Sequence, residues 1–541
     1  SFGRTRGSGE PGQYNMVFQY KQRDVGLEAA RIALQLLLSL LPETLQEELE
    51  SEIDEDFNFE QDRDDFIVFA QRKELGPSTA SLVNAAEERG IPYLRLNKYS
   101  LVQFGHGAYQ QRIQATITSK TGHIAVEISC DKEDTHNLLR DLGLPVPEQR
   151  MIYSEFEAVR AARYIGFPVV VKPLNANHGR GVSINLVNDD QVRSAFSFAR
   201  EHGTSRAVLV ESYVEGFDHR MLVVDNKLVA VAKRVPGRVV GDGKSTVAEL
   251  VDKVNEDPRR GIGHEKVLTR LELDRPALEL LELAGHDADT VLPDGEIFYL
   301  RNTANLSTGG TAIDLTDVVH PDNREMAERA IRAVGLDVGG VDFLTSDISE
   351  SYKEIGGAIV EVNAAPGFRM HVAPSEGEPR DVAGKVMDML FPPGTPTRIP
   401  VASITGTNGK TTTSRMLSHI LKTAGHTVGM TSTDGVYIDG RLSVKGDMTG
   451  PTSAHIVLRD PSVDIAVLET ARGGLLRSGL GYRQCDVSAC LNVSADHLGL
   501  KGIDTLEQLA ELKRIVVEVA RDTAVLNADD DLCLKMADYT Q

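Results

Sequence analysis

The sequence predicts a protein of several α/β and α+β domains, and three observations support this fold class. Its 541 residues are too many for one hydrophobic core, so about three domains are expected. Between residues 131 and 391, short β-branched runs such as Val169-Val-Val171 alternate with helical stretches. From residue 399, an apolar strand, a glycine loop and a helix from Thr411 to Ala424 follow one another. The stiff run from Pro392 to Thr397 marks the clearest boundary, and we expect domains at 1–130, 131–393 and 394–541.

Composition excludes some classes of function. A formal charge of −21 argues against a nucleic-acid partner, which needs clustered lysine and arginine. It would suit a cationic ligand, although acidic surfaces mostly serve solubility. No apolar run reaches the ~20 residues that span a bilayer, so no membrane partner is expected. The four cysteines form no CxxC pair, which predicts free thiols in a reducing cytoplasm.

The first 130 residues are predicted to form an α/β region without chemistry of its own. We expect an amphipathic helix from Val25 to Leu41 and a strand from Phe66 to Ala70. The segment from Leu75 to Thr79 is typical of a turn into a helix, with Ser78 or Thr79 as the N-cap.

Three oxygen-bearing side chains in the middle region predict a magnesium site. Glu361 and Asn363 follow the apolar run Ala358-Ile-Val360 and share one face of a strand, since residues i and i+2 point the same way. Asp342 lies on an earlier apolar strand. Such oxygens suit Mg²⁺ that also holds nucleotide phosphates. The alternative is a set of polar side chains on a solvated sheet face.

Residues upstream predict a nucleotide site beside this metal site. Lys172 ends a strand, and a loop with two glycines follows it, which would let backbone N–H groups close around phosphate oxygens. The alternative is an ordinary hairpin turn. A strand leaving through a connector then offers backbone groups to an adenine edge. The candidate residues of the loop and connector are His178, Gly179, Arg180, Gly181, Glu211, Ser212 and Val214.

From about Asp131 to Phe391, this set resembles the ATP-grasp fold. The resemblance implies that Lys132 and Lys172 reach ATP phosphates, with Lys233 a weaker candidate for the same role. It also implies that Glu211–Val214 holds adenine and that Asp342, Glu361 and Asn363 bind Mg²⁺. ATP-grasp ligases phosphorylate a carboxylate and let an amine attack the acyl phosphate. That reaction needs cations around the phosphates rather than a protein nucleophile.

The glycine loop of the C-terminal region lies between a predicted strand and a predicted helix, the context that makes a phosphate loop credible. Lys410 would reach the outer phosphates, and the Thr411 hydroxyl would ligate Mg²⁺. The loop departs from the GxxxxGK[ST] spacing because Ile404 stands where the first glycine would be. It consists of Gly406, Thr407, Asn408, Gly409, Lys410, Thr411 and Thr412.

The sequence GTNGKTT resembles the Mur ligase and folylpolyglutamate synthetase group. The resemblance implies that Glu469 and His497 are further Mg²⁺ ligands and that Lys513 is carbamylated; a lone histidine or lysine would otherwise be a core or surface residue. Asn527–Asp530 matches a motif near the end of the central domain of that group. Such ligases continue into a closing C-terminal domain, so we expect the 394–541 domain to be partial.

An ATP-grasp region followed by a Mur-type region resembles the cyanophycin synthetase family, whose motifs recur from Phe2-Gly-Arg-Thr-Arg6 onward. The resemblance implies synthesis of multi-L-arginyl-poly-L-aspartate from ATP, L-aspartate, L-arginine and a polymer primer, by a cytoplasmic homo-oligomer. One site would add aspartate to the backbone carboxylate, and the other would join arginine to the aspartate side chain. Catalytic roles are implied for Arg220, Arg301 and Lys513. The implied substrate contacts are Asp218, His219, Arg220, Asn305, Ser307, Thr431, Ser432, Thr433 and Arg472.

Two alternatives stay open at this point. One is another ligase of the same chemistry, such as a dipeptide or glutathione-like synthetase, because pocket selectivity rests on few side chains. The other is a nucleotide-binding scaffold whose second module is inactive.

Overall fold

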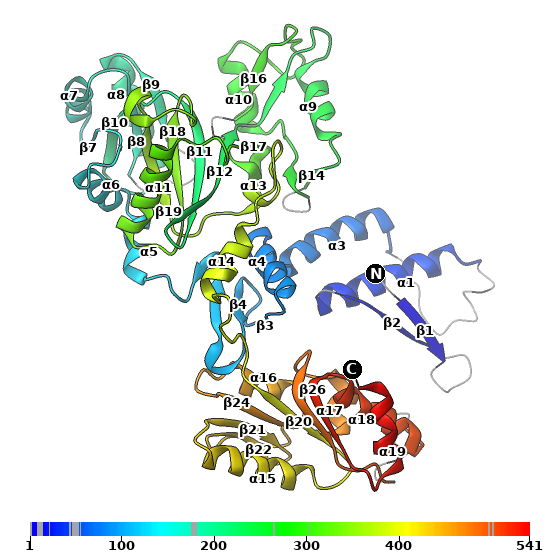
Figure 1. Ribbon diagram of the computed structural model, residues 1–541. Helices are drawn as coiled ribbons and strands as arrows, with labels where there is room; N and C mark the ends of the chain where they lie inside the picture. Colours follow the sequence, from blue (N-terminus) through cyan, green and yellow to red (C-terminus); the bar gives the residue numbers. More distant parts are fainter. Residues whose placement is uncertain are drawn as a thin grey trace. The chain divides into compact units, whose positions relative to one another are not determined.

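The computed structural model describes residues 3–7, 14–20, 22–42, 45, 54, 56–174, 181–262, 266–301, 303–495, 498–499 and 503–540 (Figure 1). The chain forms two compact units. The first comprises Ser1–Leu27, Ala86–Ile113 and Phe391–Gln541, and the second comprises Glu28–Ala85 and Gln114–Leu390. Within the described ranges, no helix is both long and apolar enough to cross a membrane.

The N-terminal part contains a hairpin of β1 (Gly3–Gly7) and β2 (Tyr14–Phe18), followed by α1 (Arg23–Leu40). The predicted strand Phe66–Ala70 is wrong, because this segment lies inside α3 (Phe59–Lys73). The Asn58 side chain caps that helix by accepting from Gln61 N, and acidic residues occupy its first turn. The predicted N-cap is also wrong, because α4 (Pro77–Glu88) already begins at Pro77.

Segment 86–113 of the first compact unit packs against the C-terminal sheet of the same unit. It contains β3 (Tyr93–Arg95), β4 (Leu101–Phe104) and the turn η1 (Gly107–Tyr109), and β3 pairs antiparallel with β4. The Ala108 amide donates to the Val463 carbonyl at 2.8 Å. Gly107 has a φ of 57°, and a Cβ there would lie 2.4 Å from the same carbonyl oxygen, so this close approach requires glycine.

Besides α3, the second compact unit contains β6 (Ile117–Thr118), α5 (His123–Cys130) and α6 (Lys132–Asp141), which follow β5 (Gln111–Gln114) in the chain. A four-stranded antiparallel sheet follows, in the order β7 (Gln149–Ile152), β10 (Val208–Ser212), β8 (Val169–Pro173) and β9 (Ser183–Leu186). Helices α7 (Glu155–Ile165) and α8 (Asp189–His202) share one apolar core with this sheet.

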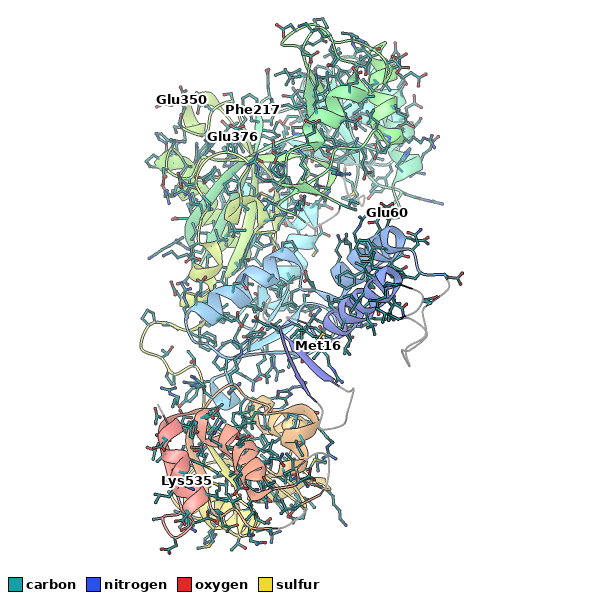
Figure 2. All side chains as sticks on the ribbon, turned by 90° about the vertical axis from the view of Figure 1, so that its right-hand side faces the viewer. Met16, Glu60, Phe217, Glu350, Glu376 and Lys535 are labelled. Atoms are coloured by element: carbon teal, nitrogen blue, oxygen red, sulfur yellow. The ribbon has the colours of Figure 1, made fainter. Side chains whose placement is uncertain are left out.

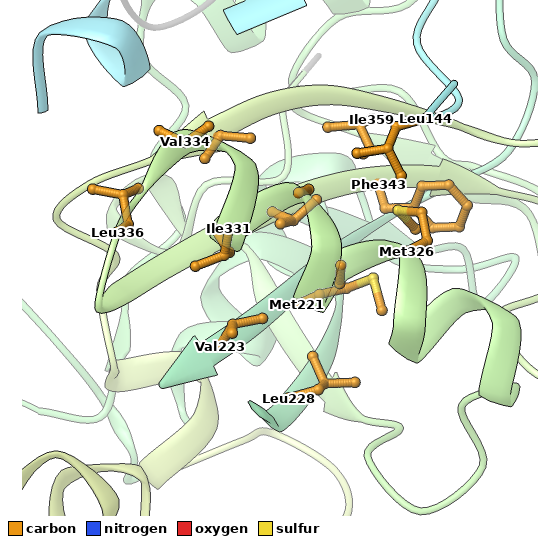
Figure 3. Packing of buried hydrophobic residues seen from close by; sticks show 14 of the residues in the cluster. Leu144, Met221, Val223, Leu228, Met326, Ile331, Val334, Leu336, Phe343 and Ile359 are labelled. Carbon is orange, nitrogen blue, oxygen red and sulfur yellow. The ribbon is translucent and has the colours of Figure 1, made fainter. Parts of the chain in front are cut away.

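A five-stranded antiparallel sheet holds the first candidate site. Its order is β17 (Thr311–Asp314), β12 (Lys227–Val235), β11 (Phe217–Val224), β18 (Val338–Thr345) and β19 (Ala358–Asn363). One face packs on α11 (Pro321–Val334), where Met221, Ile331 and Phe343 are buried together (Figure 3). Since side chains alternate along a strand, the opposite face carries the polar residues. The short helices α12 (Tyr352–Ile355), α13 (Arg369–Val372) and α14 (Val382–Leu390) complete the unit.

Residues 238–300 form a lobe inserted between β12 and β17, which we call the inserted lobe. It contains β13 (Arg238–Val240), α9 (Val247–Asn255), β14 (Arg260–Gly261), β15 (Leu268–Thr269), α10 (Arg275–Leu283) and β16 (Ile297–Tyr299). The described residues of the lobe have their own core, with Leu250, Leu281 and Leu292 buried in it. The turn η2 (Leu306–Thr308) leads back to the five-stranded sheet.

The C-terminal part of the first compact unit is a seven-stranded sheet in the order β23 (Arg441–Lys445), β22 (Gly435–Ile438), β21 (Val428–Ser432), β24 (Ile465–Glu469), β20 (Val401–Thr405), β25 (Cys485–Cys490) and β26 (Ala520–Leu526). The five strands from β21 to β26 in this order are parallel. The accompanying helices are α15 (Lys410–Thr423), α16 (Pro451–Arg459), α17 (Arg472–Ser478), α18 (Leu506–Glu518), α19 (Asp531–Leu534) and the turn η3 (Lys535–Tyr539).

Candidate active sites

The polar face of the five-stranded sheet brings the predicted metal ligands together. Arg220 on β11 lies opposite Asp342 on β18, and Asp342 in turn lies opposite Glu361 on β19. Asn363 lies opposite Gly340, one step further along the same face. Directly opposed residues of antiparallel strands share a face, so these side chains form one row across three strands.

An ion-pair network lies at the centre of this row. Arg220 donates to both carboxylate oxygens of Asp342, and Arg234 on β12 bridges Asp218 Oδ2 at 2.6 Å and Asp342 Oδ2 at 2.9 Å. Burial opposes the ionisation of Asp342, yet the charges of Arg220 and Arg234 outweigh it and hold the pKa of this carboxyl below its usual range. Sequence reasoning missed Arg234 and chose its neighbour Lys233.

Replacing Arg234 with glutamine is expected to lower the free energy of unfolding by about 3–5 kcal/mol, because the buried Asp342 and the half-buried Asp218 would lose a shared guanidinium. Chemical denaturation followed by circular dichroism measures the change. Arg332→Gln is the matched control, since Arg332 is exposed on α11. Equal midpoints for the two variants would show that the network adds little stability.

Two lysines and two glutamates converge at a small pocket beside this face. Lys132, Lys172, Glu211 and Glu361 all line it, and Lys172 Nζ lies 2.5 Å from Glu211 Oε1. Burial and the nearby charge of Lys172 lower the pKa of Lys132. Such a pair of close ammonium groups suits phosphate oxygens. Gly181 has a positive φ of 73°, whereas His178, Gly179 and Arg180 lie outside the described residues.

A larger cleft of about 540 Å³ adjoins the connector after β10. Its lining includes the predicted adenine-binding residues Glu211, Ser212 and Val214 and, from the polar face, Asp218 and Arg234. Arg301 also lines it, but its guanidinium already donates to the carbonyls of Leu300 and Glu272 and pairs with Asp274. Arg234 and Arg301 therefore both line this cleft, each held by contacts of its own.

Four predicted substrate or phosphate residues are placed apart from the row. His219 and Lys233 lie opposite each other on the face turned away from Asp342. Burial lowers the pKa of His219 to about 4, and Lys233 Nζ stacks over the ring of Phe217, which Figure 2 labels. Asn305 and Ser307 belong to the turn at η2, where the Asn305 carbonyl accepts from the amides of Thr308 and Gly310.

The row offers a fit for Mg²⁺. Glu361 is exposed and Asp342 is fully engaged by arginines, so Glu361 is the freer carboxylate. The Asn363 amide nitrogen is buried, and it has no hydrogen-bond partner among the described residues. The Asn363 side-chain amide can therefore turn its oxygen towards a bound ion without breaking a hydrogen bond of its nitrogen. Carboxylate and amide oxygens side by side are the donor types that Mg²⁺ prefers.

The second site is built on the glycine loop between β20 and α15. Gly406 has a φ of 147°, and a Cβ there would lie 3.0 Å from Leu491 Cβ, so the tight turn requires glycine. The Asn492 carboxamide oxygen accepts from the amides of Thr407 and Asn408 at 3.1 and 2.8 Å. Lys410 Nζ donates to the Thr407 carbonyl across the loop. Gly409 precedes α15, and Thr412 lies in its first turn, so the loop opens at a helix N-terminus.

Glu469 and Thr411 meet at the end of the loop. The Thr411 hydroxyl lies 3.1 and 3.0 Å from the two Glu469 carboxylate oxygens, and 3.2 Å from the Thr433 hydroxyl. The Thr431 hydroxyl accepts from the Glu469 amide at 3.0 Å, and the Ser432 hydroxyl bonds Asp434. Burial raises the pKa of Glu469 against the opposing effects of Thr411 and Lys410. A cation bound here would favour the ionised form of Glu469.

Lys513 is buried on α18 close to Lys410 and Arg472. Burial and then the charge of Lys410 lower its pKa to about 8, so a large share of the amine is neutral near that pH. A neutral lysine amine is the form that reacts with CO₂. His497, the predicted third metal ligand, lies outside the described residues.

The free energy of unfolding is expected to rise as the pH increases from about 8 towards 10.5. Over this interval the unfolded chain keeps a proton at Lys513 that the folded protein has released, so higher pH favours folding. The gain over the whole interval is about 3 kcal/mol. Urea denaturation at several pH values measures it, and Lys513→Met should remove this component. The same pH slope in the variant would contradict the expectation.

Sequence reasoning missed the role of Asn492, whose side chain holds the glycine loop in place. A second layer supports it: the Asn527 side chain donates to the Leu491 carbonyl at 2.9 Å, and Asp530 accepts from the Val493 amide at 2.7 Å. The Asn527–Asp530 motif therefore stabilises the strand end behind the loop. An asparagine directly after a buried parallel strand was the available signal.

Three known families match parts of the chain. Residues 404–541 match the Mur ligase middle domain, residues 128–218 match the ATP-grasp domain, and residues 1–42 match the cyanophycin synthase-like N-terminal domain. Among solved structures, a bifunctional glutathione synthetase from Pasteurella multocida is similar at a TM-score of 0.49 and 29% identity, covering 62% of this chain and 46% of that one.

Curated relatives match over longer stretches. The cyanophycin synthetase of Synechocystis sp. is 51% identical over 540 residues, which are 99% of this chain and 61% of the relative. The cyanophycin synthetase of Nostoc sp. is 51% identical over 543 residues, which are 100% of this chain and 59% of the relative. A bifunctional glutathione biosynthesis protein of Clostridium perfringens is 32% identical over 325 residues, which are 59% of this chain and 41% of the relative. The chain thus spans about three fifths of the length of the first relatives. The similarity to these cyanophycin synthetases therefore runs through the whole length of this chain.

Proposed function

We propose that this chain carries two ATP-dependent amide ligase modules that together extend cyanophycin, multi-L-arginyl-poly-L-aspartate. The observation that supports the proposal is that the two sets of residues predicted to bind phosphate lie in two separate compact units. Lys132 and Lys172 belong to one, and the loop of Lys410 belongs to the other. The domain division at 1–130, 131–393 and 394–541 is part of the proposal, with 131–393 as the ATP-grasp module and 394–541 as the Mur-type module.

In the first module, the carboxylate at the polymer end is phosphorylated, and the amine of L-aspartate then attacks the acyl phosphate. Lys132 and Lys172 bind the ATP phosphates, and the connector residues Glu211–Val214 hold adenine. Arg220 orients the reacting carboxylate while its bond to Asp342 keeps its own guanidinium in place. Arg234 and Arg301 contact the carboxylates of the aspartate in the adjoining cleft.

In the second module, the side-chain carboxylate of the new aspartate is phosphorylated, and L-arginine attacks it to form an isopeptide bond. Lys410 and the loop amides bind phosphate oxygens, while Thr431, Thr433 and Arg472 hold the polymer end. Carbamylated Lys513 acts beside Lys410 and adds a negative charge there.

The residues that would hold Mg²⁺ are Glu361, Asn363 and Asp342 in the first module and Thr411, Glu469 and His497 in the second. When bound, the ion neutralises negative charge that develops on the phosphates. We also propose a cytoplasmic setting, which is supported by the four free cysteines. Assembly of several copies of the chain remains a prediction from the family resemblance.

The test measures ADP release by the chain with a short primer and aspartate alone, arginine alone, or both. The proposal expects one round of release with aspartate alone and sustained release only with both. A glutathione-like ligase would respond to other amino acids instead, and the 32% identity to a glutathione biosynthesis protein makes this the alternative to check. Release that depends on neither amino acid would indicate a nucleotide-binding scaffold.

A further inference from the structure

A further cleft lies within the first compact unit, and its described lining contains none of the lysines of the two proposed phosphate-binding sets. It has a volume of about 510 Å³, which is in the range of small-molecule sites. Segment 86–113 forms one wall and the C-terminal sheet with its loops forms the other. The two walls are joined by backbone bonds and by the Gln103 side chain, which donates to the Leu458 carbonyl at 3.0 Å.

The charged residues of this cleft are two arginines and one glutamate. Arg483 Nη2 lies 2.6 Å from Glu87 Oε1, and the Arg483 guanidinium also lies 5.5 Å from the ring of Tyr93. Arg398 donates to the side-chain oxygen of Gln484 at 3.3 Å. The described lining therefore has a net positive charge, although the whole chain carries −21. A cationic ligand would be repelled here and an anion attracted.

A buried imidazole borders the same cleft. His106 is only 5% exposed, and its Nδ1 has no hydrogen-bond partner among the described residues. Burial, with a smaller contribution from His455, lowers its pKa to about 4, so the ring is neutral at physiological pH. The His455 ring, in contrast, bonds the backbone of Gly481. A buried polar atom without a partner costs free energy unless water or a ligand satisfies it.

We propose that this cleft binds a small ligand through a carboxylate group. A guanidinium presents a planar fork that matches the two oxygens of a carboxylate, and the cleft offers two of them, on Arg398 and Arg483. The rings of Tyr93 and Tyr482 provide apolar walls for a short carbon chain, and the neutral His106 ring provides a further hydrogen bond. Glu87 limits the affinity for the carboxylate, because it already forms an ion pair with the Arg483 guanidinium.

One side chain, that of Tyr482, connects this cleft to the second candidate active site. The Tyr482 hydroxyl lies 2.5 Å from Ser403 Oγ and 3.5 Å from Thr470 Oγ1. Ser403 lies on the strand that leads into the phosphate loop, and Thr470 directly follows Glu469. A ligand that contacts Tyr482 and shifts it would change nucleotide affinity there, and bound nucleotide would change the ligand's affinity by the same factor.

Isothermal titration calorimetry of the full chain with succinate tests the proposal, with L-aspartate and inorganic phosphate as comparison probes. Arg398→Gln should weaken succinate binding about tenfold, the usual loss for a hydrogen bond to a charged group. Glu87→Gln should tighten it, since Arg483 is released and a repelling charge is removed. Arg441→Gln, a change of an exposed arginine on β23, is the matched control and should have no effect.

Lys172→Ala and Lys410→Ala distinguish this cleft from the two nucleotide sites, because neither should change succinate binding. Three results would overturn the proposal: no binding at millimolar succinate, equal affinity in Arg398→Gln and Glu87→Gln, or loss of binding in Lys410→Ala alone. Phosphate binding that is stronger than succinate binding and responds to Arg398→Gln would replace a carboxylate ligand with a phosphate one. Circular dichroism checks that each variant folds. If Arg398→Gln does not fold, the affinity of Glu87→Gln for succinate decides the proposal.

Discussion

Glutamine in place of Glu361 is expected to lower aspartate-dependent ADP release by more than about 100-fold, since even the outer partners of metal ligands commonly contribute 10–100-fold. The change keeps the size and hydrogen-bonding capacity of the side chain but removes its charge. Glu361 is the exposed carboxylate of the row, whereas Asp342 is held by two arginines and is not free to replace it. A coupled assay with primer and aspartate measures the rate.

Glu350→Gln is the matched control, because Glu350 is an exposed glutamate of the same unit, on a loop that Figure 2 labels. The control should keep the normal rate and both variants should keep the normal melting temperature. A near-normal rate for Glu361→Gln in a folded protein would remove Glu361 from the metal site.

Alanine in place of Lys410 is expected to slow arginine addition by about 10²–10³-fold, the usual cost of losing one preorganised charge at a reacting group. A single aspartate addition to a primer that already ends in an arginine-bearing unit should continue at the normal rate. The reason is that Lys132 and Lys172 belong to the other compact unit. Mass spectrometry of the primer counts each addition separately.

Lys445→Ala, on an exposed position of β23, controls for the loss of a lysine from the same unit. If Lys410→Ala also stopped the single aspartate addition, the two phosphate-binding sets would have to act as one site. The two-module proposal would then be wrong.

The phosphate loop could be predicted from the sequence because its residues are contiguous and their geometry is local. Gly406 and Lys410 lie between a strand and a helix in the structure, as the sequence predicted. The pair of Glu361 and Asn363 was predictable for the same reason, since strand alternation alone puts both on one face.

The misplaced residues depended on contacts between distant parts of the chain. Lys233 and Arg234 are adjacent, and only the register of β11 with β12 decides which of them faces Asp342.

The run Phe66–Ala70 is apolar and short, so its period does not separate strand from helix. The Asn58 cap and the basic residues Arg72 and Lys73 at the other end were the better signals. The cleft of Arg398 and Arg483 joins segments that are far apart in the sequence, and no local pattern indicates it.

The inserted lobe bears on how proteins with this architecture can diversify. Its buried residues contact one another rather than the five-stranded sheet, and the chain leaves β12 and returns to β17 beside the cleft of Arg234. A segment with its own core and neighbouring ends can be exchanged, lengthened or shortened without disturbing the register that pairs Arg220 with Asp342. Recombination between related genes at the two ends of this segment would keep the phosphate-binding lysines of one parent. The other parent would supply Tyr299, and with it a new substrate preference.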